Sequence, residues 1–243
     1  MKDSLLEIIT NRQIAKNTYE MTLAGDISDI SAPGQFVNVK LDGYYLRRPI
    51  SVCEAKDGVL TLIYKVVGRG TEAMAKMPCG EKLLTLVGLG NGYDLEKSGD
   101  APLLIGGGAG VPPMYMLCRE LVAQGKKPTV ILGFGSKDEV FYKEEFERLG
   151  ARVLVTTVDG SEGIKGFVTN AMDEVDYTYF YTCGPEPMLK AVFAKSKTSG
   201  QFSFEERMGC GFGACMGCSC KVVTGYKRIC KDGPVLEKEE ILW

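Results

Sequence analysis

The sequence FEERMGCGFGACMGCSC occupies residues 204–220, and a further cysteine follows downstream. Four cysteines of this region, Cys210, Cys215, Cys218 and Cys230, have the spacing C-x4-C-x2-C-x11-C. Three thiolates on one tight loop and a fourth on a later segment can enclose a two-iron cluster, and this is the spacing of plant-type 2Fe-2S sites. Neighbouring glycines let the backbone approach the sulfur atoms and direct N–H groups at them. The stretch therefore predicts a 2Fe-2S site.

Other uses of these cysteines remain open at this stage. A structural zinc site usually has two separated C-x2-C pairs, whereas only Cys215 and Cys218 form such a pair here. Disulfides are typical of small secreted chains in oxidising compartments. Cys220 is an alternative ligand to Cys218, but only Cys218 preserves the x2 spacing. We therefore expect iron rather than zinc, with Cys218 as the third ligand.

The composition limits the classes of protein to which the chain can belong. It has 243 residues, of which 45% are hydrophobic, enough for one large or two ordinary domains. Its net charge of -2 gives no electrostatic footprint for nucleic acid or an anionic membrane. No apolar run has the length of a membrane span, and the first residues lack the features of a signal peptide. We expect a cytoplasmic protein whose cysteines are ligands or buried thiols.

The chain contains no histidine. This excludes Ser-His and Cys-His nucleophile pairs, histidine metal ligands and the commonest general base. Together with a predicted cluster, the absence of histidine favours electron transfer, in which cofactors carry the reactive chemistry.

Residues 1–97 have the pattern of a small antiparallel β-barrel. Short β-rich runs are separated by turns that contain Gly, Asp, Asn and Pro. The runs cover residues 5–9, 18–23, 35–41, 50–54, 59–66 and 82–87.

One short motif in this barrel suits a flavin dinucleotide, and it consists of Arg48, Pro49, Ile50 and Ser51. An arginine beside a proline-stiffened strand can hold a pyrophosphate with its planar fork, and the hydroxyl of Ser51 can bond an isoalloxazine nitrogen. Taken alone, the tetrapeptide describes a strand start with a surface arginine equally well.

A second segment of the barrel runs from a strand through a glycine turn into a helix expected over residues 72–76. Free N–H groups at a helix start attract phosphate, and a glycine there allows close approach. An ordinary N-cap by a threonine would have the same pattern. The residues concerned are Tyr64, Lys65, Val66, Gly70 and Thr71.

After a composition break near residues 98–102 the chain alternates strands with helices. Such alternation predicts a parallel sheet covered by helices on both faces, here over residues 98–200. Strands are expected over residues 103–105, 129–133, 152–157 and 177–182, and helices over residues 112–124, 141–148, 166–174 and 185–196.

The turn after the first of these strands reads GGGAGVPP over residues 106–113. Gly108 and Gly110 form the G-x-G start of a dinucleotide fingerprint, although Pro113 stands where a Rossmann fold carries its third glycine. Because the turn follows a strand and opens a helix, it predicts a pyrophosphate cradle that includes Gly107.

Two later turns complete the expected nucleotide site. Asp138 follows the second strand, where it could bond an adenosine ribose or repel a 2′-phosphate, whereas Ser136 and Lys137 could bind that phosphate. NAD is therefore favoured only slightly over NADP. Cys183 and Gly184 follow the last strand and would lie beside the nicotinamide, although Cys183 could instead be a small buried thiol.

In this order, the motifs at residues 48–51, 70–71, 106–113 and 183–185 resemble the ferredoxin reductase superfamily, in which an FAD-binding barrel precedes a pyridine nucleotide domain. With the cysteine loop and the ending CKDGPVLE, the whole chain is similar to the electron transfer subunits of NAD-dependent dihydroorotate dehydrogenase B.

The resemblance implies a multidomain fold of α+β and α/β parts. It consists of an FAD-binding antiparallel β-barrel (1–97), a parallel α/β domain for NAD (98–200) and a small 2Fe-2S domain (201–243). Arg48 to Ser51, Tyr64 to Val66 and Gly70-Thr71 would hold FAD. The cluster ligands would be Cys210, Cys215, Cys218 and Cys230.

The resemblance also implies a partner. In that family, a separate FMN-containing catalytic subunit oxidises dihydroorotate to orotate, and electrons pass through the cluster and FAD to NAD+. Two such chains and two catalytic chains form a heterotetramer. The alternatives are the small subunit of another flavin/2Fe-2S reductase, such as a ferredoxin:NADP oxidoreductase, hydrogenase or sulfide dehydrogenase, and a zinc-stabilised binding module.

Overall fold

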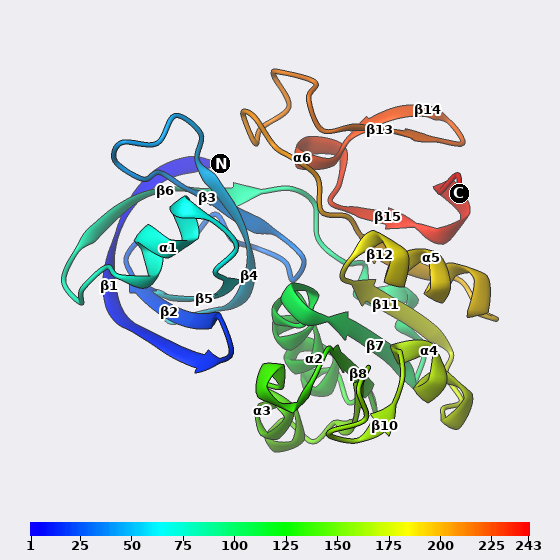
Figure 1. Cartoon of the computed structure of the whole chain (residues 1–243). Helices are drawn as coiled ribbons and strands as arrows, with labels where there is room; N and C mark the ends of the chain where they lie inside the picture. The colour runs from blue at the N-terminus through cyan, green and yellow to red at the C-terminus, as the bar shows by residue number, and fades with distance from the viewer.

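The computed structural model describes residues 1–243 and confirms the predicted fold class. A closed barrel and an α/β layer lie side by side, and the cysteine-rich segment lies above both of them (Figure 1). None of the helices is long and apolar enough to cross a membrane.

The barrel is antiparallel throughout, with the strand order β1-β2-β5-β4-β3-β6. Helix α1 (Arg69–Ala75) packs against it through Met74, which is buried in the barrel core. The helix begins three residues before the expected start at residue 72. The strands are β1 (Lys2–Ala15), β2 (Thr18–Ala24), β3 (Phe36–Val39), β4 (Arg48–Lys56), β5 (Val59–Lys65) and β6 (Lys82–Leu89).

Strand β1 is longer than the expected run of residues 5–9, and its length closes the barrel. Its first half pairs with β6 and its second half with β2, with a register shift between Ile8 and Thr10. Alternate residues Leu6 and Ile8 are buried in the barrel, as the period of a half-buried strand requires. The second half escaped prediction because its residues are mostly polar and exposed.

A sheet of seven strands in the order β10-β9-β8-β7-β11-β12-β15 forms the centre of the α/β layer. All its neighbouring strands are parallel except β12 and β15. The strands are β7 (Pro102–Gly107), β8 (Thr129–Phe134), β9 (Arg152–Thr157), β10 (Ile164–Lys165), β11 (Tyr179–Cys183), β12 (Gly200–Ser203) and β15 (Val235–Glu237), and the helices are α2 (Pro112–Ala123), α3 (Lys143–Arg148), α4 (Val168–Ala171) and α5 (Glu186–Lys195).

Helices cover both faces of this sheet, as predicted. Leu104 of β7 is buried in one hydrophobic cluster with residues of α2 and α3. Its neighbours Leu103 and Ile105 belong to a second cluster with residues of α4 and α5. Successive side chains of a strand point to opposite faces, so this division follows directly from the run of apolar residues in β7.

The last strand of the sheet comes from the cysteine-rich segment. After β12 the chain forms the cysteine loop, a hairpin of β13 (Ser219–Val222) and β14 (Gly225–Arg228), and helix α6 (Ile229–Asp232). It then returns as β15, which pairs antiparallel with β12. The boundary expected between residues 200 and 201 therefore falls inside β12, and the sheet is not wholly parallel.

Phe202 of β12 gives a test of this attachment. Its side chain is fully buried, and its ring lies edge-on to Phe180 at 5.3 Å and to Trp243 at 5.5 Å between centroids. We expect Phe202→Ala to destabilise the fold by about 3–5 kcal/mol, because it leaves a cavity under the β12–β15 pair. Thermal unfolding measures this loss of stability, and Phe202→Leu should show a smaller one. Equal melting temperatures for Phe202→Ala and the wild-type protein would contradict the expected destabilisation.

Candidate cofactor sites

A cavity of about 390 Å³ lies between the barrel and the segment that leads into the cysteine loop. Most residues of the predicted flavin motifs line it, namely Arg48, Pro49, Ile50, Ser51, Tyr64, Lys65 and Thr71. Val66 and Gly70 do not line it, although both adjoin residues that do. The structure thus brings together two barrel segments that were predicted to act together.

Arg48 is the group in this cavity best suited to an anion. Its guanidinium lies over the ring of Tyr44, 4.9 Å from the ring centroid, and donates a hydrogen bond to the carbonyl oxygen of Leu46. Its contacts include no carboxylate, so its charge is available to a pyrophosphate. The cavity therefore fits the phosphate-bearing part of FAD.

Gly70 makes room for that arginine. A Cβ atom added at Gly70 would collide with Nε of Arg48. The hydroxyl of Thr71 accepts hydrogen bonds from the N–H groups of Val67 and Gly68 at 3.0 and 3.3 Å, but the N-cap of α1 is Gly68. The N-cap alternative considered for Thr71 is therefore wrong, because the helix begins earlier.

The opposite wall of the flavin cavity comes from residues that the motifs did not reveal. It is lined by the last residue of β12 and by residues that follow the strand, namely Ser203, Phe204, Glu205, Glu206 and Met208. Burial raises the pKa of the Glu205 carboxyl. Their place in the cavity wall depends on the β12–β15 pairing. The only feature of the sequence that could have indicated it is their position immediately before the cysteine loop.

A second cavity, of about 560 Å³, lies at the carboxyl edge of β7, β8 and β9, where open α/β sheets bind nucleotides. Gly107 and Gly108 line it. Gly108 has φ +51°, and a Cβ added there would meet no atom within 4 Å, so its backbone is accessible to a ligand. Gly110 acts differently: a Cβ there would collide with the carbonyl oxygen of Cys183, so this glycine lets the turn pack against β11.

The remaining nucleotide residues do not line this cavity. Cys183 is buried in the core, which raises the pKa of its thiol, and Gly184 lines a third cavity. Asp138 contacts the barrel, because its carbonyl oxygen accepts the N–H of Lys16 at 2.8 Å. The carboxylate that lines the nucleotide cavity is that of Glu139, which lies 3.4 Å from Nζ of Lys65. Contacts of Asp138 and Cys183 with NAD stay predictions.

The four cysteines predicted to bind the cluster are arranged in two pairs. The backbone N–H of Cys215 donates to the sulfur of Cys210, and the backbone N–H of Cys230 donates to the sulfur of Cys218. A two-iron cluster with four thiolates needs two at each iron, so this pairing fits it.

Backbone N–H groups are directed at these sulfur atoms. Those of Ala214 and Cys215 donate to Sγ of Cys210 at 3.2 and 3.5 Å, and that of Cys230 donates to Sγ of Cys218 at 3.4 Å. Burial opposes ionisation of Cys210, but these donors, with the N–H of Phe212, lower the pKa of its thiol to about 6. Burial raises the pKa of Cys230 to about 12. The loop thus provides the hydrogen bonds that stabilise cluster sulfur atoms.

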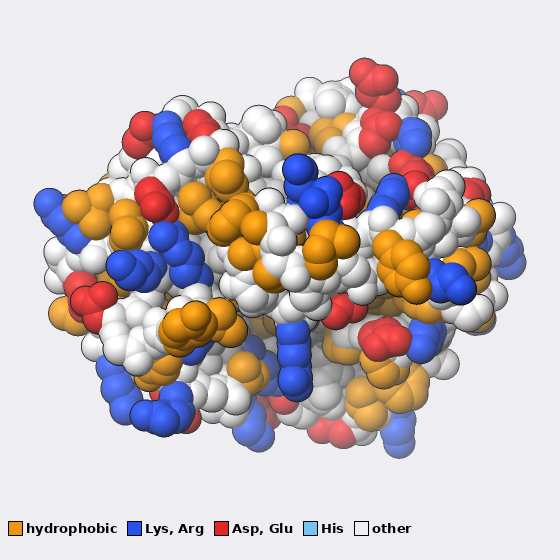
Figure 2. Space-filling model, turned by 90° about the horizontal axis from the view of Figure 1, so that it is seen from above, with side chains coloured by type: hydrophobic (Ala, Val, Ile, Leu, Met, Phe, Trp, Pro, Cys, Tyr) orange, Lys and Arg blue, Asp and Glu red, His pale blue; other side chains and the backbone are white.

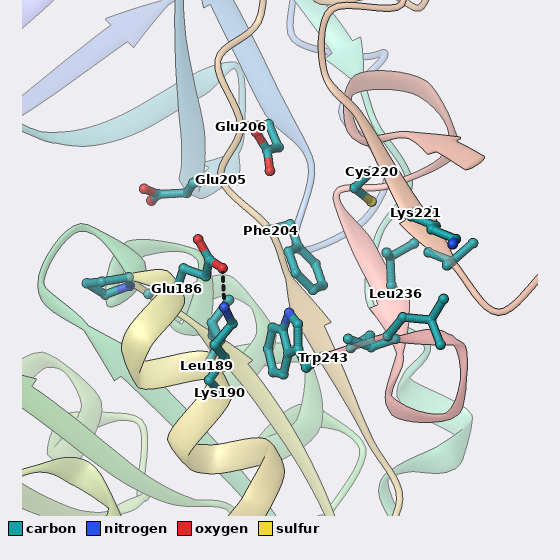
Figure 3. Close-up of a pocket in the computed structure, with 15 residues that line it drawn as sticks. Glu186, Leu189, Lys190, Phe204, Glu205, Glu206, Cys220, Lys221, Leu236 and Trp243 are labelled. Atoms are coloured by element: carbon teal, nitrogen blue, oxygen red, sulfur yellow. Dashed lines mark ion pairs between the residues drawn. The ribbon is translucent and has the colours of Figure 1, made fainter. Parts of the chain in front are cut away.

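No three cysteine, aspartate or glutamate side chains are grouped closely enough to hold one metal ion. Cys220 lies on β13 and its sulfur lines the third cavity, of about 480 Å³, between α5 and the cysteine-rich segment (Figure 3). Trp243 and the ion pair of Glu186 with Lys190, 2.7 Å between charged atoms, lie in the same region.

Taken together, an arginine-containing barrel cavity, a nucleotide cavity at the edge of a parallel sheet and paired cysteines define a reductase of the iron-sulfur flavoprotein class. Comparison with known proteins agrees. Residues 205–242 match the family model described as the iron-sulfur cluster binding domain of dihydroorotate dehydrogenase B, and residues 104–193 match the oxidoreductase NAD-binding domain.

Similar proteins cover the whole chain. The electron transfer subunit of dihydroorotate dehydrogenase B (NAD(+)) from Lysinibacillus sphaericus is 44% identical over 98% of both chains, and that from Fusobacterium nucleatum is 46% identical over 93% of both. A solved structure of an NADH-dependent reduced ferredoxin-NADP oxidoreductase has a TM-score of 0.90 and 31% identity, covering 98% of this chain and 90% of that one. The chain belongs to the family of electron transfer subunits of NAD+-dependent dihydroorotate dehydrogenase B, and its cofactors are FAD, a 2Fe-2S cluster and NAD.

Substitution of Gly70 tests the arginine of the flavin cavity. A Cβ at position 70 meets the flexible end of Arg48 rather than backbone, so Gly70→Ala displaces the guanidinium without unfolding the barrel. Loss of a charged hydrogen bond is expected to weaken FAD binding about tenfold to a hundredfold. The measurement is the dissociation constant of FAD from the purified protein.

Gly68→Ala is the matched control for that variant. A Cβ at Gly68 meets no atom within 4 Å, so FAD affinity should stay at the wild-type value. Equal affinities of the two variants would contradict the role assigned to Arg48.

A series of cysteine-to-serine variants tests the cluster ligands. Replacing Cys210, Cys215, Cys218 or Cys230 removes one thiolate and should abolish the visible absorption of the cluster and most of the bound iron. Cys220→Ser should retain both. If Cys218→Ser kept a full cluster and Cys220→Ser lost it, Cys220 rather than Cys218 would be the third ligand.

Proposed function

We propose that this chain carries electrons between NAD and an FMN-containing catalytic subunit that oxidises dihydroorotate to orotate, as one step in the synthesis of pyrimidines. The support is the family of the chain, whose members at 42–46% identity are electron transfer subunits of this enzyme. The nine free thiols fit a reducing compartment, and we place the complex in the cytoplasm, as two electron transfer chains with two catalytic chains.

We assign the cofactors to the sites described above. FAD lies in the barrel cavity with Arg48 at its pyrophosphate, the dinucleotide lies along Gly107 and Gly108, and the cluster is bound by Cys210, Cys215, Cys218 and Cys230. FAD exchanges either one or two electrons, so when bound it couples hydride transfer with NAD to single-electron transfer with the cluster. The protein holds these groups in place.

One contact carries this proposal: the cluster loop touches the barrel beside the flavin motif. The side-chain amide of Asn38 donates to the carbonyl oxygen of Cys210 at 3.4 Å, and Asn38 is the partner of Pro49 in the β3–β4 pair. A Cβ at Gly211 would collide with Nδ2 of Asn38, so this glycine allows the approach. The cluster loop therefore lies directly against β3, the strand that pairs with the flavin-motif strand β4.

The tip of the same loop suits a partner protein. Phe212 and Met216 are 45% and 54% exposed, and each lies within two residues of a predicted cluster ligand. Figure 2 views the molecule from above, onto the side of the N-terminus and the cysteine loop, and shows hydrophobic side chains interspersed with basic and acidic ones. Protein–protein interfaces combine an apolar centre with a polar rim, so exposed apolar side chains on this face can contact a protein partner.

Electrons should enter the complex from either end. In the anaerobically purified complex, dihydroorotate and NADH should each bleach both the flavin and the cluster absorption. The isolated chain should respond to NADH only, because dihydroorotate is oxidised on the catalytic subunit. Bleaching of the complex by NADH but not by dihydroorotate would contradict the proposed partner and favour another flavin/2Fe-2S reductase, such as the structurally similar ferredoxin-NADP oxidoreductase.

A further inference from the structure

Strand β4 contributes to two regions of the molecule. Its first residues, Arg48 to Ser51, line the flavin cavity. Its later residues Cys53 and Glu54 contact the α/β layer, and a register shift against β5 lies between Val52 and Glu54. A bulge of this kind bends a strand and re-aims its side chains. Since Cys53 is only two residues after Ser51, about 7 Å along the strand, a contact at one place positions the other.

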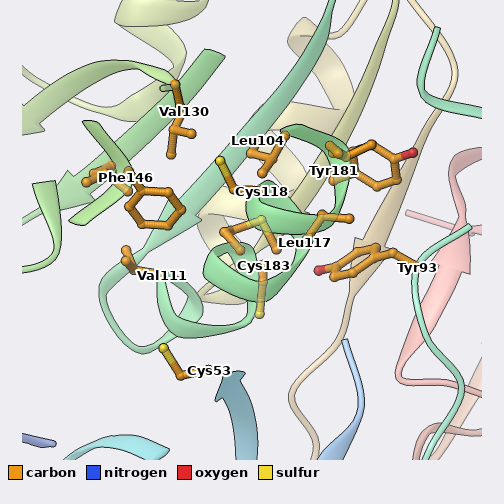
Figure 4. Close-up of a cluster of buried hydrophobic side chains, with 14 of the residues drawn as sticks. Cys53, Tyr93, Leu104, Val111, Leu117, Cys118, Val130, Phe146, Tyr181 and Cys183 are labelled. Atoms are coloured by element: carbon orange, nitrogen blue, oxygen red, sulfur yellow. The ribbon is translucent and has the colours of Figure 1, made fainter. Parts of the chain in front are cut away.

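The hydrophobic part of this contact is continuous with the core of the α/β layer. Cys53 is fully buried in the same cluster as Val111, the N-cap of α2, and Leu117 and Cys118 of that helix. Figure 4 shows Cys53 beside a barrel strand, below Val111 and the helix that carries Leu117 and Cys118. The barrel and the nucleotide site thus share one core.

Two polar contacts close this junction. Arg119 of α2 pairs with Glu54, with Nε 2.7 Å from Oε2 and Nη2 donating to Oε1 at 2.8 Å. The hydroxyl of Tyr142 donates to Oε2 of Glu20 on β2 at 2.8 Å. Arg12 holds the other oxygen of Glu20 from Nε and Nη2 at 2.9 and 2.7 Å. The Glu20 carboxylate is therefore hydrogen-bonded at both oxygens, whereas Glu54 accepts one hydrogen bond from Nη2 of Arg119 and has an ion-pair contact with Nε.

Tyr142 is held in an unusual backbone conformation. Its φ is +65°, which a bulky side chain rarely adopts and which persists only where the surroundings impose it. The surroundings here are Tyr115 and Phe141, whose rings lie edge-on to Tyr142 at 5.1 and 6.1 Å between centroids. Burial raises the pKa of its hydroxyl, which therefore stays a donor at neutral pH.

We propose that Arg119, which joins α2 to β4, and Tyr142, which joins the turn before α3 to β2 of the same barrel, are positioning residues that clamp the barrel to the α/β layer and so set the distance between flavin and nicotinamide. The inference rests on the proposed function. Hydride transfer requires reacting atoms about 3–3.5 Å apart, and a misplacement of about 1 Å can slow it a hundredfold. Neither residue lines the flavin or the nucleotide cavity, so each acts through the framework rather than by touching a cofactor.

Tyr142→Phe in the complete complex tests the clamp, with Tyr179→Phe as the matched control. The hydroxyl of Tyr179 donates to Oε2 of Glu237 at 2.9 Å, but both residues belong to the same sheet. We expect Tyr142→Phe to lower the rate of flavin reduction at saturating NADH at least tenfold, with an increased deuterium isotope effect and little change in the half-saturating NADH concentration. Tyr179→Phe should leave all three at wild-type values.

Reduction from the dihydroorotate end distinguishes a positioning role of Tyr142 from general damage to the protein. Reduction of the flavin by dihydroorotate through the cluster should be unchanged in Tyr142→Phe, because the clamp lies on the nucleotide side. Equal slowing from both ends, or NADH kinetics identical to those of Tyr179→Phe, would overturn the proposal. If Tyr142→Phe does not fold, Arg119→Lys, which keeps the charge but loses the two-point contact, takes its place with the same expectations.

A different result is expected if the proposed function itself is wrong. In that case dihydroorotate would leave the flavin of the wild-type complex oxidised. The isotope effect on flavin reduction by NADH, compared between Tyr142→Phe and Tyr179→Phe, would still test whether Tyr142 positions the flavin.

Discussion

The antiparallel pairing of β15 with β12 is the contact on which the arrangement of the redox sites depends. The chain leaves the sheet after Ser203, forms the cysteine loop and returns at Val235, opposite the same residue. Both ends of the cysteine-rich segment are therefore anchored at one point of the sheet edge. The residues that leave this point, Phe204 to Glu206, form one wall of the flavin cavity. A single pair of strands thus brings the cluster segment and the flavin site together.

Each redox site is also built from parts that are distant in the sequence. Asn38 of the barrel binds the carbonyl oxygen of Cys210, and Lys65 of the barrel lies next to Glu139 in the nucleotide cavity. Burial of Cys53 in the core of the α/β layer joins the same two bodies. Electron transfer and hydride transfer both depend steeply on distance, which explains why the parts share a core and polar contacts instead of being joined by a flexible linker.

Features that depend on local pattern were predictable from the sequence. The cysteine spacing indicated an iron-sulfur site, and the alternation of strands and helices indicated a parallel sheet whose helices cover both faces. Features that depend on tertiary contacts were not. β12 and β15 have only four and three residues, too few for a periodic pattern, so the antiparallel edge was missed. Gly70 was expected to approach phosphate, whereas its small size makes room for Arg48. Asp138 and Glu139 are neighbours in one turn, and the sequence alone does not show that the turn directs Glu139 rather than Asp138 into the nucleotide cavity.

The arrangement of the cluster ligands is tested most directly by anomalous diffraction at the iron absorption edge from anaerobic crystals of the complex. We expect two iron positions within the cysteine loop, one between the sulfur atoms of Cys210 and Cys215 and the other between those of Cys218 and Cys230, next to the barrel strand that carries Asn38. A single metal position, or an iron bound to Cys220 in the third cavity, would contradict this arrangement.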